Sequence, residues 1–168
     1  VLTFRAPARP GHTQGDQRML QTADYFDLGA YGRTITTQEP EAQAWFDRGL
    51  NWTYAYNHGE AIDCFRKAAE ADPACAMAWW GVAYARGLHI NNPEMSEEQS
   101  RRAWQAAQRA KTALDDESPV ERALVEAIQR RYAWPVPADR GPLDQQYAAA
   151  MESAWHQFPG DPDVGALY

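Results

Sequence analysis

The sequence contains few cysteines, no run of basic residues and no long apolar stretch. Its two cysteines, Cys64 and Cys75, cannot form a disulfide framework, and we expect both to be buried thiols. The formal net charge is -7 without a stripe of Lys or Arg, so nucleic acid is not an expected partner. No apolar run has the length of a membrane-spanning helix, and no signal-peptide pattern is present. We therefore expect no membrane partner and, by default, a cytoplasmic location.

Several catalytic signatures are also missing. The sequence has no Gly-rich phosphate loop, no GxSxG nucleophile elbow and no CxxC pair. Enzyme classes that depend on these devices are not supported. The sequence thus favours a protein that is not an enzyme and that needs no cofactor.

Small and aromatic residues recur in a fixed register between Trp45 and Pro73. The residues in this register are Trp45, Gly49, Trp52, Ala61, Phe65, Ala68 and Pro73. Small side chains let two antiparallel helices approach closely, while the aromatic side chains fill the space between them. Counting about 34 residues on from Trp45 reaches Trp79, which begins a second unit. The pattern predicts helical hairpins that repeat along the chain.

This register resembles the tetratricopeptide-repeat family, closely over Glu41 to Leu88 and more weakly over Ser96 to Tyr168. Arg48 departs from the pattern, because leucine is usual there. The pairing of NWTYAYNHGEAI with AWWGVAYA is similar to a group of longer bacterial repeat proteins. The resemblance implies an all-α, right-handed solenoid of about three helix pairs. We expect residues 1–36 to form a partly extended arm that packs on the array, and residues 37–168 to form the repeat domain.

Caps and breaks in the sequence define the expected elements. Asn57 with Glu60, and Ser96 with Gln99, have the form of capping boxes. The final helix has no partner within the sequence, so we expect further repeats, or a partner, beyond Tyr168. The expected helices are Pro40–Tyr56, His58–Ala71, Ala74–Leu88, one opened by Ser96 and ending at Asp115, one from Pro119 to Tyr132, Leu143–Phe158, and a short one from Pro162; a loop covers Trp134–Pro142.

The first helix of each unit lines the inner surface of such an array. The residues expected to face inward are Phe46, Leu50, Tyr54, Trp80, Tyr84 and Leu88. An apolar and aromatic surface would suit an apolar or helical segment of a protein partner, so the sequence predicts a protein-interaction or scaffolding module. An equally weighted alternative is that these residues are core, covered by residues 19–35 or by further repeats.

A second hypothesis concerns metal binding. His58 and His89 are expected at the same edge of the array, with Glu60 nearby. Two imidazoles and a carboxylate could hold a divalent metal with an open position that activates water. Against this hypothesis, capping already accounts for Glu60, and no HExxH-like spacing is present. A third hypothesis is that the chain is only the structural start of a larger protein.

Overall fold

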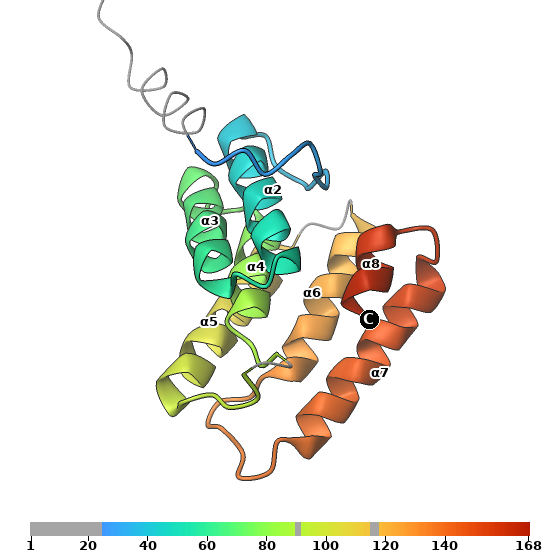
Figure 1. The fold of residues 1–168 in the computed structure, drawn as a ribbon. Helices are drawn as coiled ribbons and strands as arrows, with labels where there is room; N and C mark the ends of the chain where they lie inside the picture. Colours follow the sequence, from blue (N-terminus) through green and yellow to red (C-terminus); the bar gives the residue numbers. More distant parts are fainter. Residues whose placement is uncertain (1–24, 90–91, 115–117) are drawn as a thin grey trace, which may run out of the picture.

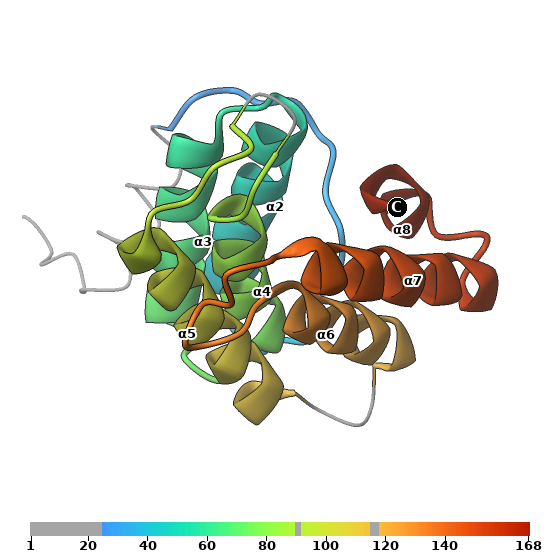
Figure 2. The ribbon, with the colours of Figure 1, turned by 90° about the horizontal axis from the view of Figure 1, so that it is seen from below.

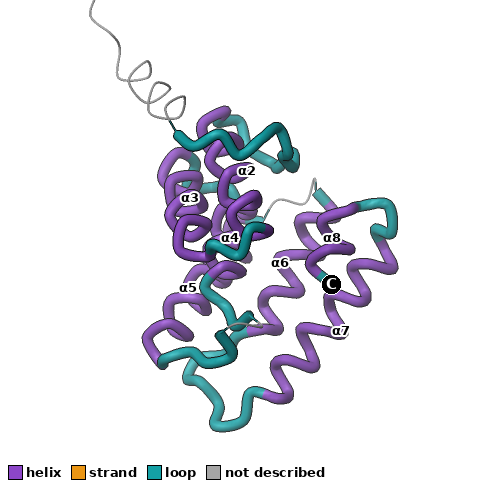
Figure 3. Tube along the Cα trace, viewed as in Figure 1, coloured by secondary structure: helices purple, strands orange, loops and turns teal. Residues whose placement is uncertain are grey.

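The computed structural model describes residues 25–89, 92–114 and 118–168, which form helices and loops without a strand (Figures 1 and 3). The expectation of an all-α fold is confirmed for these residues, while most of the expected arm lies outside them. The helices are α2 (Pro40–Tyr54), α3 (His58–Ala71), α4 (Ala76–Ala85), α5 (Glu97–Ala113), α6 (Pro119–Arg131), α7 (Gly141–Gln157) and α8 (Pro162–Leu167). None of these helices combines the length and the apolar character that a bilayer crossing requires.

Helix α4 lies at the centre of the packing. It contacts α3 and α5 most extensively, and it also contacts α2 and α6, while α6 packs against α7 (Figure 1). Its sequence, AMAWWGVAYA, has no polar face, as expected for a helix that is surrounded by others. Because α3 and α5 pack on α4 more closely than on each other, a depression remains between them above α4.

Close packing between the helices depends on glycine. The buried ring of Phe65 on α3 lies between Gly49 of α2 and Gly81 of α4. A Cβ atom added at Gly49 would lie 2.6 Å from the ring, and one added at Gly81 would lie 2.4 Å from it. No side chain larger than hydrogen fits at either position unless Phe65 moves. Gly49 therefore allows the close approach of neighbouring helices that the sequence register predicts.

Three predicted helix ends, one of α2 and both of α4, differ from the structure. Helix α2 ends at Tyr54 rather than Tyr56, since Tyr56 has a φ of 59°, which is outside the right-handed helical region. Helix α4 spans Ala76–Ala85 rather than Ala74–Leu88. At its C-terminal end, the Arg131 guanidinium donates a hydrogen bond to the Leu88 carbonyl oxygen. Before it, the Gly87 N–H donates to the Tyr84 carbonyl oxygen at 3.0 Å, in a three-residue turn that follows the helix.

The expected loop also ends earlier than predicted. Helix α7 begins at Gly141, so Pro142 lies in its first turn rather than in the loop. Proline is tolerated there because the first-turn N–H groups have no partner within the helix. The Asp139 carboxylate accepts a hydrogen bond from the Gly141 N–H at 2.8 Å, which fixes the turn into α7.

The expectation that the last helix lacks a partner is also wrong. The segment before α2 runs between α2 and α8 (Figure 2), where Arg33 donates to Asp161 at 2.7 Å and to Asp163 at 2.9 Å. Tyr31 and Tyr54 both donate to Asp163, at 2.6 and 2.5 Å. The side chains of Arg33 and Asp163 are only 9% and 5% exposed. We call these five residues the clasp, because they join the N-terminal segment, α2 and α8.

The clasp predicts a loss of stability at alkaline pH. The hydrogen bond to Asp163, and then burial, raise the pKa of Tyr31 from 10.0 to about 12. A raised pKa stabilises the fold while the phenol is protonated, and this contribution is lost as the pH rises from 10 towards 12. In urea titrations across this range, the Tyr31→Phe variant should lose less stability than the unmodified protein. Equal losses would show that Tyr31 does not contribute to the alkaline sensitivity.

Candidate functional site: an arginine groove between α3, α4 and α5

Three of the six residues that were expected to line an open inner surface are buried instead. Phe46, Leu50 and Trp80 are 0%, 1% and 2% exposed, because α2, α3 and α4 pack over them. Their assignment to an accessible groove is therefore corrected to core. The other three residues, Tyr54, Tyr84 and Leu88, are half-buried. Tyr54 already donates its hydroxyl to the clasp.

The structure brings His58 and His89 together but not Glu60. The two imidazole rings stack with centroids 4.2 Å apart and an angle of 5° between their planes. The Glu60 carboxylate instead accepts a hydrogen bond from the Tyr25 hydroxyl at 3.0 Å. Within the described ranges, no group of at least three His, Cys, Asp or Glu residues is arranged to hold a metal.

The stacked geometry suits neutral imidazoles better than metal ligands. A ring nitrogen binds a metal in the plane of its ring, so two parallel stacked rings cannot direct both lone pairs at one ion without rotating. Burial, the neighbouring His89 and the positive charge of Arg131 all lower the pKa of His58. The metal hypothesis stays a prediction, and it requires a rearrangement of both rings.

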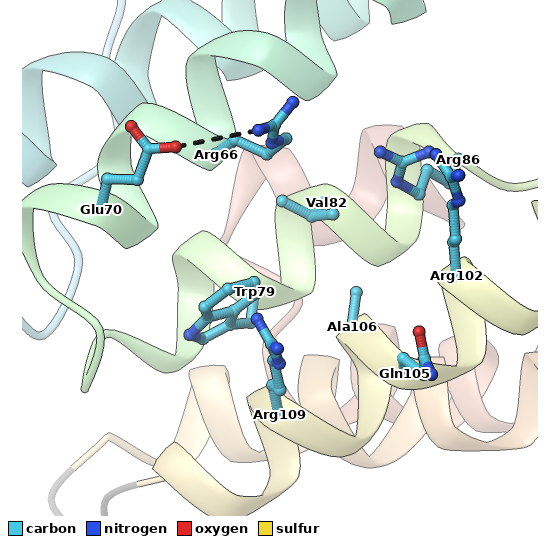
Figure 4. A pocket seen from close by; sticks show the side chains of 9 residues that line it. All are labelled: Arg66, Glu70, Trp79, Val82, Arg86, Arg102, Gln105, Ala106 and Arg109. Carbon is cyan, nitrogen blue, oxygen red and sulfur yellow. Dashed lines mark ion pairs between the residues drawn. The ribbon is translucent and has the colours of Figure 1, made fainter.

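A cluster of arginines lies on another face, in the depression above α4 (Figure 4). This cavity has a volume of about 350 Å³. Its apolar floor is formed by Val82 of α4 and Ala106 of α5, with arginines around it. We call it the arginine groove; the residues that line it are Arg66, Glu70, Trp79, Val82, Arg86, Arg102, Gln105, Ala106 and Arg109.

Helical spacing brings these side chains to one place. On α5, Arg102, Gln105 and Arg109 follow each other at intervals of three and four residues, which places them on one helix face. Trp79 and Val82 of α4 are likewise three residues apart. Because α3 and α5 both pack on α4, the exposed arginines of both helices border the same depression.

The guanidinium groups keep unused hydrogen-bond donors. Arg66 lies 3.8 Å from Asp63 and 3.9 Å from Glu70, which is too long for a hydrogen bond. Among the residues that the structure describes, the Arg102 guanidinium donates through Nε alone, to Glu98 at 2.6 Å. The Arg86 guanidinium makes no hydrogen bond or ion pair with any residue that the structure describes, although the Arg86 backbone N–H donates to the Val82 carbonyl oxygen at 3.3 Å.

Like charges are close enough to affect each other. Burial lowers the pKa of the half-buried Arg86, and the positive charges of Arg102 and Arg66 lower it further. Asp63 acts in the opposite direction but does not reverse the shift. The groove thus places several cations together with little neutralisation by the chain itself, an arrangement that favours an anionic ligand.

The groove continues into an apolar cavity. The Arg109 guanidinium lies over the Trp79 ring at 4.5 Å, and the indole N–H donates to the Pro73 carbonyl oxygen at 3.0 Å. Trp79 and Arg109 also line a second cavity of about 710 Å³. We call it the apolar extension; it is lined by Pro73, Ala74, Trp79, Gln108, Arg109, Thr112 and Ala113.

Comparisons with known proteins give no further guidance. No family model, no curated protein and no solved structure matches the chain. Sequence reasoning missed the arginine groove, although the spacing of Arg102 and Arg109 on α5 was a usable signal.

Proposed function

We propose that this chain is a tetratricopeptide-like helical repeat that acts as a protein-interaction module. Its ligand is a segment of a partner protein in which acidic side chains lie next to apolar ones. The acidic part occupies the arginine groove and the apolar part occupies the apolar extension. The observation that carries this proposal is Arg86, a half-buried cation without an ion pair among the described residues, beside Arg66 and Arg102.

Charge supports an acidic ligand. The chain has a formal net charge of -7, yet four arginines and a single glutamate line the groove. Asp63 and Glu98 lie near the groove. Asp63 makes a long contact with Arg66, and the pair of Glu98 with Arg102 is exposed, so a ligand that displaces either acid loses little free energy. A carboxylate of the ligand would form charge-assisted, bidentate hydrogen bonds with a free guanidinium fork.

The shape of the site supports an extended ligand. The two cavities share the stacked Trp79 and Arg109, so a ligand that crosses this pair can reach both. Aromatic and arginine side chains at the centre of a contact surface are common anchors of binding energy. A stack of helical hairpins would hold these side chains on rigid helices, which limits the ordering cost of binding.

The proposal predicts that binding depends on the groove arginines. Peptides selected on the protein from a random library should carry acidic residues next to apolar residues. Their affinity for the Arg86→Gln, Arg102→Gln double variant should fall about tenfold or more, because each charge-assisted hydrogen bond contributes about 1.5–3 kcal/mol. Fluorescence anisotropy with a labelled peptide measures this change.

Arg101→Gln is the matched control. Arg101 is on the same helix and pairs with the same Glu98 at 2.7 Å, but it does not line the groove. Its replacement should leave the affinity within about twofold, as expected for an exposed charge outside the contact. Selected peptides that bind the double variant and the unmodified protein equally would contradict the proposal.

A gain of affinity is expected when the acidic wall residue is neutralised. Glu70 lines the groove and faces Arg66 across 3.9 Å. The Glu70→Gln variant should bind the selected acidic peptides several-fold more tightly, because a like charge next to the ligand is removed. The increase should shrink at high salt, which screens exposed charges. Unchanged or weaker binding would place the acidic residues of the ligand elsewhere.

A further inference from the structure

Three guanidinium groups at one end of the arginine groove come from different helical elements. Arg66 is on α3, Arg86 directly follows α4, and Arg102 is on α5. In Figure 4, Arg86 and Arg102 lie next to each other and Arg66 lies across the groove from them. Since the helices are held by the core, the three side chains extend from fixed points around one space.

The donors that remain at this end exceed what one carboxylate can use. Arg102 keeps both terminal amino groups, because only its Nε bonds to Glu98. Arg66 forms only long contacts with acidic residues, and Arg86 forms no ion pair among the described residues. A carboxylate has two oxygens and one charge, and a single guanidinium fork already gives each oxygen a hydrogen bond.

A phosphate monoester fits the three groups better. It carries a charge of about -1.5 to -2 and offers three terminal oxygens as strong acceptors. We propose, building on the function above, that the anchoring group of the partner segment is a phosphorylated side chain. Its phosphoryl oxygens bind Arg66, Arg86 and Arg102. Arginine clusters are a recurrent means of recognising phosphorylated segments.

The surroundings favour a phosphorylated peptide over free phosphate. The space beside the three arginines opens along Val82 and Ala106 towards Trp79 and the apolar extension. Free phosphate would use none of that apolar surface. A phosphorylated residue with apolar residues on one side of it would use both the charged end and the apolar end of the site.

Two peptide libraries test this inference. Both have random flanking positions; one has a fixed phosphoserine, phosphothreonine or phosphotyrosine at its centre, and the other has a fixed glutamate there. The best peptides of each are titrated into the full chain and into the Arg66→Gln, Arg86→Gln and Arg101→Gln variants. Thermal melting of each variant verifies that it is folded.

The expected result is that phosphorylated peptides bind about tenfold or more tightly than glutamate peptides. Arg66→Gln and Arg86→Gln should abolish this preference, while Arg101→Gln should retain it. Equal, arginine-dependent affinities for both peptides would overturn the phosphate inference and leave the proposed function standing. Absence of arginine-dependent binding in both libraries would overturn both proposals. Inorganic phosphate that binds as tightly as the whole phosphopeptide would overturn the peptide as ligand.

Discussion

Gly81→Ala is expected to destabilise the protein by about 3 kcal/mol, the upper end of the usual cost of overpacking. The added Cβ atom would lie 2.4 Å from the Phe65 ring, and Gly49 closes the other side of that ring. The gain in helix propensity from glycine to alanine, about 1 kcal/mol, cannot offset such a clash. Urea denaturation measures the change in the free energy of unfolding.

The cause of this effect can be isolated with Phe65. If the clash is responsible, Phe65→Leu should cost less in the Gly81→Ala background than in the unmodified protein, with a coupling of about 1 kcal/mol or more. Gly59→Ala is the matched control, since the nearest atom to its added Cβ is 3.8 Å away. That control should be neutral or slightly stabilising. A Gly81→Ala variant as stable as the control would contradict the packing described for Phe65.

Asp163→Ala is expected to cost about 3 kcal/mol and to release α8. Asp163 accepts hydrogen bonds from Tyr31, Arg33 and Tyr54, so its loss leaves three donors without this acceptor. Removal of one partner from a buried ion pair typically costs about 3–5 kcal/mol, and the remaining Arg33–Asp161 pair keeps the effect at the lower end. Amide hydrogen exchange should become faster in α8 and in residues 31–36.

The exposed Glu152 of α7 provides a comparison. Glu152→Ala removes a carboxylate that is close in sequence to α8, and it should change the stability by less than about 0.5 kcal/mol. Unaltered exchange in α8 of the Asp163→Ala variant would mean that the hydrogen bonds to Asp163 do not hold this helix. In that case α8 would depend on the Arg33–Asp161 pair and on its packing against α7.

Local signals in the sequence predicted much of the helical architecture. Ser96 and Gln99 form the expected capping box, and the Asn57 side chain accepts the hydrogen bond from the Glu60 N–H at 3.3 Å. These predictions succeed because a cap depends on residues three positions apart. Glu60 itself was misjudged, since its carboxylate bonds to Tyr25, which is 35 positions away.

Long-range contacts explain what the sequence could not predict. The bond between Tyr31 and Asp163 joins residues 132 positions apart, and no periodic pattern indicates such a partner. Phe46 and Leu50 were assigned to a surface because the register shows which way a helix faces but not what covers it. The arginine groove was missed for a similar reason, because Arg66 and Arg86 meet Arg102 only once α3 and α5 pack on α4.

The most direct test of the proposed binding site is nuclear magnetic resonance of the labelled chain during titration with a selected acidic peptide. The account predicts shifts at the Trp79 indole N–H and at the side chains of Arg86 and Arg102. Signals of Tyr84 and His89 should stay in place, because these residues do not line the groove. Shifts that are confined to Tyr84, Leu88 and His89 would locate binding on the inner surface and contradict the arginine groove as the site.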